Sequence, residues 1–315
     1  MSHARSWFVL TLFALGCGGT PVHESSRDHA RIDYQGHRGA RGLRPENTLE
    51  AFRHAIELGV DTLEMDVMLT ADDVLVVHHD ERLNRDITRD ETGAWLTATG
   101  PALRTLTLAE LSRYDVGRIH PGTAYAARFP DQVGGDGVRI PTLRAVVEDA
   151  ERRSRGRIRY NLEIKTTPGH PDDTAPPQVV ADHLVTLVRE LGIAGRTTIQ
   201  SFDWRGLQRV KAIAPELPRS CLTQADNVKP GETAWTDGLD VARFAGSVPQ
   251  LVARFGCPIW SPDDGTLTAA DVVEAHRLHI QVLPWTVNTA AAMARVLAWG
   301  VDGIITDFPD RLPHR

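Results

Sequence analysis

The 315-residue chain lacks an excess of basic charge. Its 35 Lys and Arg residues are outnumbered by 41 Asp and Glu residues, which gives a formal net charge of −6. Nucleic acids and anionic lipid surfaces are bound largely through clustered basic side chains. We therefore expect no nucleic-acid partner, and attachment to a membrane would need a device other than charge.

Cysteine is also scarce. The three cysteines form neither a CxxC pair nor the Cys/His spacing of a zinc site. Cys221 and Cys257 lie in apolar stretches, where cysteine most often acts as a separate small hydrophobe. A disulfide between them is the alternative, because an exported protein would meet an oxidising compartment.

The apolar stretch near the N-terminus is too short to span a bilayer. Residues 7–15 follow Arg5 and have the length of a signal-peptide core. The next residues, ending in Gly16-Cys17, resemble a bacterial lipobox, although Ala14 stands where Leu is usual. We predict a signal peptide at 1–17 with lipidation of Cys17, ordinary cleavage nearby being the alternative. A polar tether would follow at 18–30, in an exported protein that is periplasmic or a membrane-anchored lipoprotein.

From residue 32 onward, β-rich runs alternate with helical patterns such as Val180/Leu184/Leu187/Leu191. The β-rich runs cover 32–37, 61–67, 158–164, 197–202, 217–223, 258–261, 281–287 and 303–306. This alternation predicts one α/β domain over 31–315, a TIM-type (β/α)8 barrel with its active site at the C-terminal strand ends. A doubly wound open sheet is the main alternative, but no glycine-rich dinucleotide loop follows the first run.

One run interrupts the alternation. Residues 74–79 follow the second run so closely that a parallel crossover cannot fit, so we expect an antiparallel hairpin there. Residues 80–140 then show few periodic patterns and several Gly and Pro residues. We interpret them as an insertion over the barrel mouth, with a short helix at 108–113.

Acidic side chains mark two predicted strand ends. Glu64 and Asp66 are two residues apart on a strand, so both point to one face, and Glu163 lies on the next parallel strand. Converging carboxylates are costly unless a cation neutralises them. Oxygen ligands without clustered cysteines suit Ca²⁺ or Mg²⁺. The alternative is that these are ordinary solvent-facing strand residues.

Two histidines accompany these carboxylates. His37 and His79 could supply the acid and base that phosphodiester cleavage requires, because histidine titrates near neutral pH. With a two-residue hairpin turn, His79 lies on the carboxylate face and His78 on the other, whereas a three-residue loop would reverse this. Arg38 and Lys165 could hold phosphate oxygens.

These motifs together resemble the glycerophosphodiester phosphodiesterase family. The resemblance covers residues 34–310 and rests on HRGARGLRPENTLEAF, LEMDV, VLVVHHDERLNR, NLEIK, QSFD, PWTVN and GVDGIITDFP in that order. It implies a TIM barrel that uses a divalent ion to hydrolyse glycerophosphodiesters, small-molecule substrates, to sn-glycerol 3-phosphate and an alcohol. By motif match, His37 and His79 become the acid/base pair. Glu64, Asp66 and Glu163 become metal ligands, and Arg38 and Lys165 phosphate contacts.

The resemblance also suggests further roles. Glu46 would approach the metal or the glycerol hydroxyls, and Trp285 would form an apolar wall at the mouth, a core position being its alternative. Asn47 is interpreted as a helix N-cap with Glu50 three residues on, and Asp307 as a turn former. The glycerol 2-hydroxyl would be the nucleophile, giving a cyclic phosphate, although direct attack by water stays open.

Three other functions compete with this one. A phospholipase D-like enzyme acting on lysophospholipids or sphingolipids would share the layout of histidines and carboxylates. A binding protein that has lost catalysis would not need both histidines and all three carboxylates to be intact. A metal-dependent sugar isomerase on the same barrel would not explain why Arg38 and Lys165 converge with the two histidines.

Overall fold

The computed structural model describes Met1, His3 and residues 31–313. Cys17, the predicted cleavage region and the 18–30 tether lie outside the described residues. Within residues 31–313, no helix combines the length and apolar character needed to cross a membrane.

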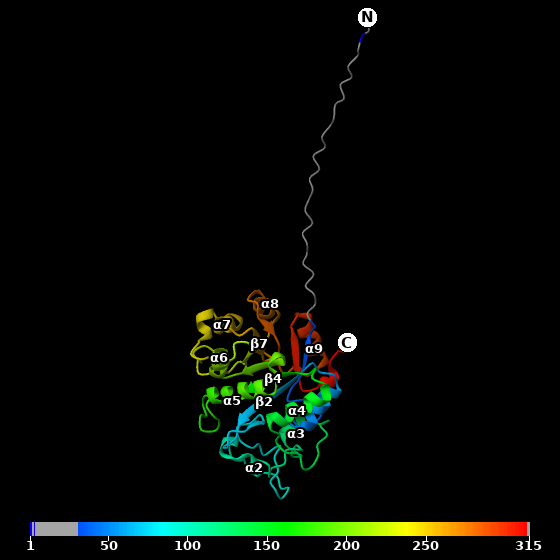
Figure 1. The fold of residues 1–315 in the computed structure, drawn as a ribbon, viewed down its shortest axis with the longest axis vertical. Helices are drawn as coiled ribbons and strands as arrows, with labels where there is room; N and C mark the ends of the chain where they lie inside the picture. Colours follow the sequence, from blue (N-terminus) through cyan, green and yellow to red (C-terminus); the bar gives the residue numbers. More distant parts are fainter. Residues whose placement is uncertain (2, 4–30, 314–315) are drawn as a thin grey trace. The chain divides into compact units, whose positions relative to one another are not determined.

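A parallel sheet forms the centre of the domain (Figure 1). Its strands are β1 (Asp33–Gly36), β2 (Thr62–Leu69), β4 (Arg159–Ile164), β5 (Thr197–Ser201), β6 (Arg219–Thr223), β7 (Ile259–Pro262), β8 (Gln281–Val282) and β9 (Gly303–Thr306). They run in the order β8-β7-β6-β5-β4-β2-β1-β9. Each matches one of the eight β-rich runs of the sequence.

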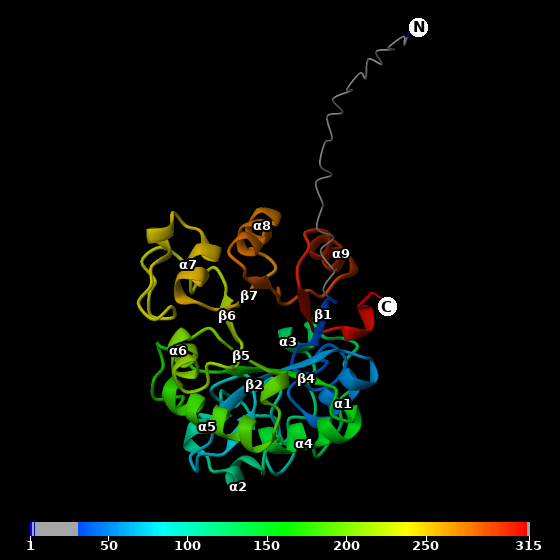
Figure 2. The same cartoon turned by 45° about the horizontal axis from the view of Figure 1, so that its top comes forward.

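The sheet is bent into a nearly closed barrel. β8 and β9 form no ladder, but hydrogen bonds join the two segments: the N–H of Val287 donates to the carbonyl of Ile305 at 2.9 Å, and that of Ile305 to the carbonyl of Pro284 at 3.0 Å. Helices surround the strands in Figure 2, as expected for a (β/α)8 barrel. The predicted barrel is therefore confirmed, and the open sheet is excluded.

The α-helices are α1 (Leu49–Glu57), α2 (Leu108–Leu111), α3 (Ala124–Arg128), α4 (Leu143–Ser154), α5 (Pro177–Glu190), α6 (Trp204–Ile213), α7 (Val248–Phe255), α8 (Ala269–Arg277) and α9 (Ala290–Ala298). Short 3₁₀ turns are η1 (Leu103–Thr105), η2 (Ala194–Arg196), η3 (Val241–Phe244) and η4 (Pro309–Arg311). Many helices begin after a Thr or Ser whose hydroxyl accepts a backbone N–H, as Thr142 does for α4. On α5, Val180, Leu184 and Val188 repeat every four residues and are buried.

The expected hairpin is present, but its register differs from the prediction. β3 (Leu75–Val77) pairs antiparallel with β2, and Val67 is opposite Val77. This register leaves a three-residue loop, Ala71 to Asp73, so Asp66 is opposite His78 rather than His79. The two-residue turn was therefore wrong. β3 ends at Val77, so the direction of the His79 side chain is set by the loop and not by strand alternation.

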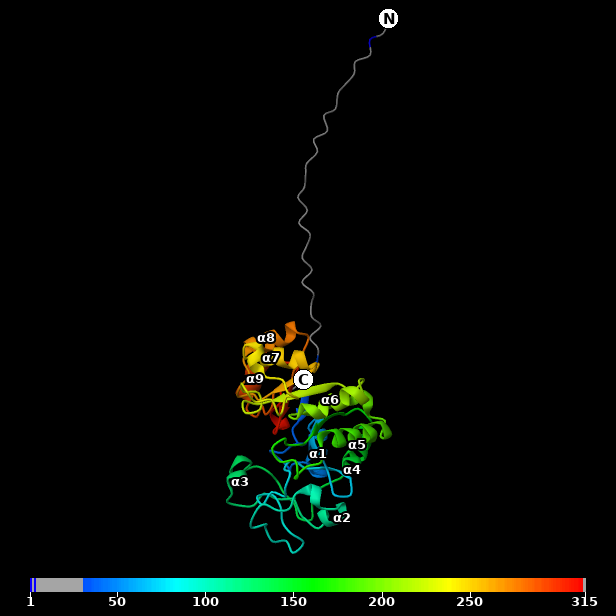
Figure 3. The ribbon, with the colours of Figure 1, turned by 90° about the vertical axis from the view of Figure 1, so that its left-hand side faces the viewer.

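The segment between β3 and α4 contains η1, α2 and α3 and has its own small core. That core consists of Met68, Val76, Leu83, Leu103, Leu111, Val116 and Ile140, so it uses one face of the hairpin. Figures 1 and 3 both show α2 and α3 at the end of the domain away from α8. The short helix expected at 108–113 corresponds to α2.

Cys221 of β6 and Cys257 before β7 form a disulfide, with Cα atoms 6.0 Å apart. β6 and β7 are paired neighbours, with Ser220 opposite Ile259, and this pairing brings the two cysteines together. The interpretation as separate hydrophobes was wrong because the register between two parallel strands cannot be inferred from either strand alone.

Candidate active site

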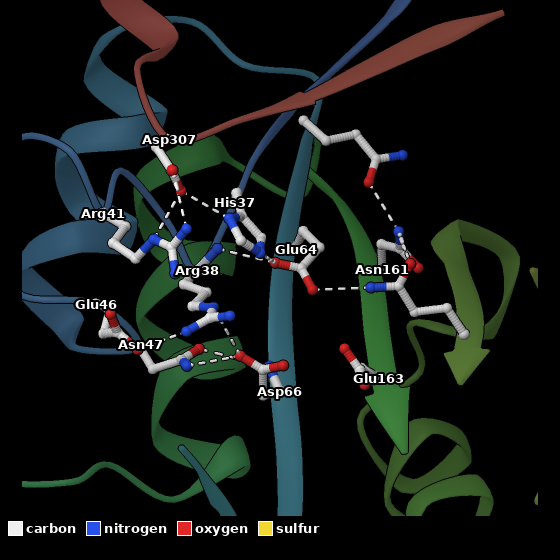
Figure 4. A network of polar contacts seen from close by, with 12 residues as sticks. His37, Arg38, Arg41, Glu46, Asn47, Glu64, Asp66, Asn161, Glu163 and Asp307 are labelled. Atoms are coloured by element: carbon white, nitrogen blue, oxygen red, sulfur yellow. Dashed lines mark hydrogen bonds and ion pairs between the residues drawn. The ribbon is translucent and has the colours of Figure 1, made fainter. Parts of the chain in front are cut away.

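Three buried carboxylates meet at the C-terminal end of the barrel (Figure 4). Glu64 and Asp66 come from β2, and Glu163 comes from β4, where it is directly opposite Asp66. The three side chains offer oxygen atoms that all lie within 4.8 Å of one another. The predicted convergence is therefore present in the structure.

Hydrogen bonds fix the carboxylates from several sides. Glu64 accepts the backbone N–H of Arg38 and the side-chain amide of Gln200, both at 2.8 Å. Asp66 accepts the side-chain amide of Asn47 at 2.9 Å. Its second oxygen, Oδ1, is buried and has no hydrogen-bond partner among residues 31–313, although Lys165 Nζ lies 3.6 Å away.

The charges on this cluster are only partly balanced. Burial raises the pKa of Glu163 to about 7, with the Asp66 charge adding to the shift and Lys165 opposing it. Burial and the same Asp66 charge raise the pKa of Glu64. Three carboxylates that resist simultaneous ionisation, one with an unpaired buried oxygen, suit a hard divalent cation.

A sharp turn after β1 places His37 and Arg38 beside the cluster. Arg38 has a φ of 50° and Gly39 a φ of 83°. A Cβ on Gly39 would lie 2.6 Å from the backbone of Ala51, so only glycine fits against α1. This turn aims the N–H of Arg38 at Glu64 and brings His37 Nε2 to 3.9 Å from the same carboxylate.

His37 is held by a buried aspartate. Its Nδ1–H donates to Asp307 Oδ1 at 2.7 Å, and Asp307 is fully buried. Asp307 also accepts two hydrogen bonds from Arg41 and one from Asn288. Burial and the Arg41 charge lower the pKa of His37 to about 4. His37 is therefore a neutral imidazole whose free Nε2 borders the site.

His79 has a similar but more open arrangement. Its Nδ1–H donates to Asp80 Oδ1 at 2.7 Å, and Asn84 donates to the other oxygen of Asp80 at 2.7 Å. The His79 side chain is 28% exposed, against 9% for His37. Burial, together with the Arg38 and Lys165 charges, lowers the pKa of His79.

Glu46 does not join the carboxylate cluster. Its Oε1 accepts from Arg38 Nη1 at 2.8 Å, and its Oε2 accepts the hydroxyl of Tyr125 from α3. Arg38 and Tyr125 thus contact both its oxygens, and the approach of Glu46 to the metal or the glycerol hydroxyls stays a prediction. Glu46 instead links Arg38 to the segment that follows the hairpin.

One cavity of about 280 Å³ collects most of the expected residues. It is lined by His37, Arg38, Glu64, His79, Glu163, Lys165 and the aromatic side chains of Phe202, Trp235 and Trp285. Trp285 and Phe202 meet edge to face, with ring centroids 5.3 Å apart. Trp285 is thus in the wall, as the apolar-wall interpretation has it.

Several site residues were missed or misinterpreted from the sequence. Asn47 is not the N-cap of α1, since Thr48 accepts the N–H of Ala51 and Asn47 instead binds Asp66. Asp307 is not merely a turn former but the partner of His37. The QSFD motif, which contains Gln200 and Phe202, contributed to the family resemblance, but no function was predicted for these two residues. Nothing in the sequence indicated that Tyr125 or Trp235 belongs to the site.

Comparison with known proteins agrees with this geometry. A model of the Glycerophosphoryl diester phosphodiesterase family matches residues 37–311. The chain belongs to this family. A glycerophosphodiester phosphodiesterase of Caldanaerobacter subterraneus subsp. tengcongensis is 31% identical over 287 residues, which is 88% of this chain and 94% of that protein.

Solved structures of other family proteins share the fold. A candidate glycerophosphoryl diester phosphodiesterase from Silicibacter pomeroyi has a TM-score of 0.81 and 38% identity, and the match covers 89% of this chain and 91% of that one. An Oleispira antarctica phosphodiesterase, solved with its product sn-glycerol-3-phosphate, has a TM-score of 0.64 and 22% identity over 89% of this chain and 94% of its own. The family resemblance and the enzyme class, a phosphodiester hydrolase, are confirmed.

Proposed function

We propose that the protein hydrolyses glycerophosphodiesters to sn-glycerol 3-phosphate and an alcohol, with a divalent ion bound by Glu64, Asp66 and Glu163. The observation that carries the proposal is the convergence of these three carboxylates with two Asp-paired histidines around one cavity. The product bound by the Oleispira antarctica relative is consistent with this substrate class.

The two histidines provide the proton transfers. One imidazole accepts the proton of the attacking glycerol 2-hydroxyl at Nε2, while the other, as imidazolium, protonates the leaving oxygen. The new bond joins the 2-oxygen to phosphorus as the bond to the leaving oxygen breaks. Water then opens the cyclic phosphate with the histidine roles reversed.

The carboxylates on Nδ1 suit both roles. An ionised carboxylate only accepts hydrogen bonds, so Asp307 and Asp80 keep the proton of each imidazole on Nδ1 and leave Nε2 free. A bound phosphodiester anion also favours the protonated form of a neighbouring imidazole. Each Asp–His pair can therefore hold and release a proton at Nε2.

Arg38 and Lys165 are the phosphate contacts in this proposal. Both line the cavity, and both already face Asp66, at 3.3 Å and 3.6 Å. A divalent cation held by the three carboxylates would supply Lewis acidity at the phosphate, and Ca²⁺ or Mg²⁺ fits an all-oxygen set.

Export is part of the proposal. A disulfide between Cys221 and Cys257 persists in oxidising compartments and is rare in a reducing cytosol. This supports a signal peptide at 1–17 and an exported protein, tethered to a membrane if Cys17 is lipidated.

Turnover of defined substrates tests the activity. Purified protein should release glycerol 3-phosphate from glycerophosphocholine and glycerophosphoethanolamine, and EDTA should abolish this until Ca²⁺ or Mg²⁺ is restored. His79→Ala should lower kcat by about 10²- to 10⁴-fold. His54→Ala, a control on α1 outside the cavity, should not.

Metal binding can be measured without activity. Added Ca²⁺ or Mg²⁺ should raise the Tm of the wild type and raise that of Glu163→Gln less, because a ligand is lost. Full turnover after removal of all metal would contradict the proposal. Cleavage of lysophosphatidylcholine alone would favour the phospholipase D-like alternative.

A further inference from the structure

A second cavity adjoins the first on the side of α3. It measures about 460 Å³ and shares His37, Arg38, His79 and Trp285 with the first cavity. Arg41, Asp80 and Asn84, from the loops after β1 and β3, also line it, and the remaining walls come from α3 and from the loops after β7 and β8. The charged side chains that α3 and these last two loops add are Arg128 and Asp263.

His37, Arg38 and His79 therefore lie between two cavities whose other lining residues differ. The carboxylates Glu64 and Glu163 line the first cavity but not the second. A phosphodiester carries one ester arm on each side of phosphorus. Because the proposed nucleophile belongs to glycerol and reacts beside the carboxylates, the glycerol arm belongs in the first cavity and the other arm in the second.

The second cavity offers one cation and one anion that lack a partner of opposite charge. Arg128 packs its guanidinium over Tyr125 and Phe129, at 5.6 Å and 5.4 Å from the ring centroids, and makes no ion pair within residues 31–313. Asp263 accepts the N–H of Gly265 at 2.9 Å and, in the same described region, is bound by no cationic side chain.

A third cavity, about 670 Å³, is the competing place for the alcohol. It touches His79 and Lys165 but neither His37 nor Arg38. Its charges largely pair with one another: Arg82 binds Asp173 at 2.6 Å, and His170 lies 3.3 Å from Glu81. Arg85 on its rim is 60% exposed and supplies a matched control for Arg128.

We propose that the cavity between α3 and the loops after β7 and β8 binds the leaving alcohol, and that it suits a zwitterionic alcohol such as the serine head group. Arg128 would bind the carboxylate of the alcohol and Asp263 its ammonium group. This inference rests on the proposed phosphodiesterase function and adds to it the class of leaving group.

The test compares kcat/KM for glycerophosphoserine, glycerophosphoethanolamine and glycerophosphoglycerol. Arg128→Ala should lower the value for the serine compound roughly five- to tenfold relative to the ethanolamine compound. Asp263→Asn can still accept the N–H of Gly265. It should lower kcat/KM for both amine-containing substrates by a similar factor, relative to kcat/KM for the glycerol compound.

Two controls locate the effect. Arg85→Ala should leave all three substrate ratios unchanged. Inhibition by glycerol 3-phosphate, which has no leaving arm, should be the same in the wild type, Arg128→Ala and Asp263→Asn, and equal Tm values would exclude misfolding.

Unchanged substrate ratios in Arg128→Ala and Asp263→Asn would overturn the subsite, as would a ratio shift produced by Arg85→Ala. A parallel change in glycerol 3-phosphate inhibition would place these residues in the glycerol subsite instead. If the wild type cleaves neither these three substrates nor glycerophosphocholine, the phosphodiesterase proposal itself fails, and the subsite with it.

Discussion

Reduction of the Cys221–Cys257 disulfide should cost this barrel a large part of its stability. The two cysteines are 36 residues apart in the sequence, and the enclosed segment includes α7. A cross-link of this span restricts the unfolded chain by about 4 kcal/mol at 25 °C. Since folded domains are stable by only about 5–15 kcal/mol, the loss is severe.

Urea unfolding of the oxidised and the reduced wild type measures this directly. The reduced protein keeps both sulfur atoms, so packing around Cys221 and Cys257 changes little and the difference isolates the cross-link. We expect a lower midpoint and a Tm lower by on the order of 10 °C. The Cys221→Ala, Cys257→Ala double variant should lose at least as much, because both side chains are buried.

Peptide mapping decides whether the bond exists. A non-reduced digest should contain one peptide that joins Cys221 to Cys257. Equal urea midpoints for the oxidised and reduced forms would refute the loop-entropy argument even if the peptide were found, and its absence would remove one support for export.

Three further predictions concern other polar contacts. Asp307→Asn should lower kcat about a hundredfold or more with little change in KM, because the amide no longer keeps the His37 proton on Nδ1, and an unchanged kcat would refute this. Tyr125→Phe should lower the free energy of unfolding by about 1–3 kcal/mol, measured in urea, through loss of the hydrogen bond to buried Glu46; an equal midpoint would contradict it. Hydrogen bonds from neighbouring arginines outweigh burial and lower the pKa of Asp149 to about 2, so its stabilising contribution is present above pH 4 and is lost as the pH falls towards 2. The Tm gap between the wild type and Asp149→Asn should therefore close over that pH range, and a constant gap would exclude the effect.

The barrel and the pair of carboxylates on β2 could be predicted because they depend on short-range patterns. Alternation of β-rich and helical segments fixed the order of the strands, and a two-residue spacing placed Glu64 and Asp66 on one face. Glu163 joins them because β2 and β4 are neighbouring parallel strands in which Asp66 is opposite Glu163. The alternation predicted that these strands are neighbours, and the structure supplied the register that puts Asp66 opposite Glu163.

The features that the sequence did not predict depend on contacts between strands that are far apart in the sequence. The disulfide depends on the register between β6 and β7, and the role of Asp307 depends on β1 and β9 being neighbours, far apart in sequence. His79 was chosen for a reason that proved wrong, since the three-residue loop puts His78 opposite Asp66. His79 nevertheless lines the cavity. It follows the end of β3 at Val77, and its ring is held by the hydrogen bond to Asp80.

The balance of charge gives a further argument for one divalent ion rather than two. Glu46 and the cluster of Glu64, Asp66 and Glu163 together carry four carboxylates. Within residues 31–313 these carboxylates form ion pairs with two cationic side chains other than histidine, Arg38 and Lys165, so two negative charges stay uncompensated when all four are ionised. One divalent ion neutralises that excess, whereas a second would create a buried positive charge of equal cost. The remaining charges pair off separately, because Asp307 is balanced by Arg41, and Asp80 is balanced whenever His79 is protonated for its proposed role as the acid. With one divalent ion bound, these charges therefore sum to zero when His79 is protonated, as its role as the proposed acid requires, and to one negative charge when His79 is neutral.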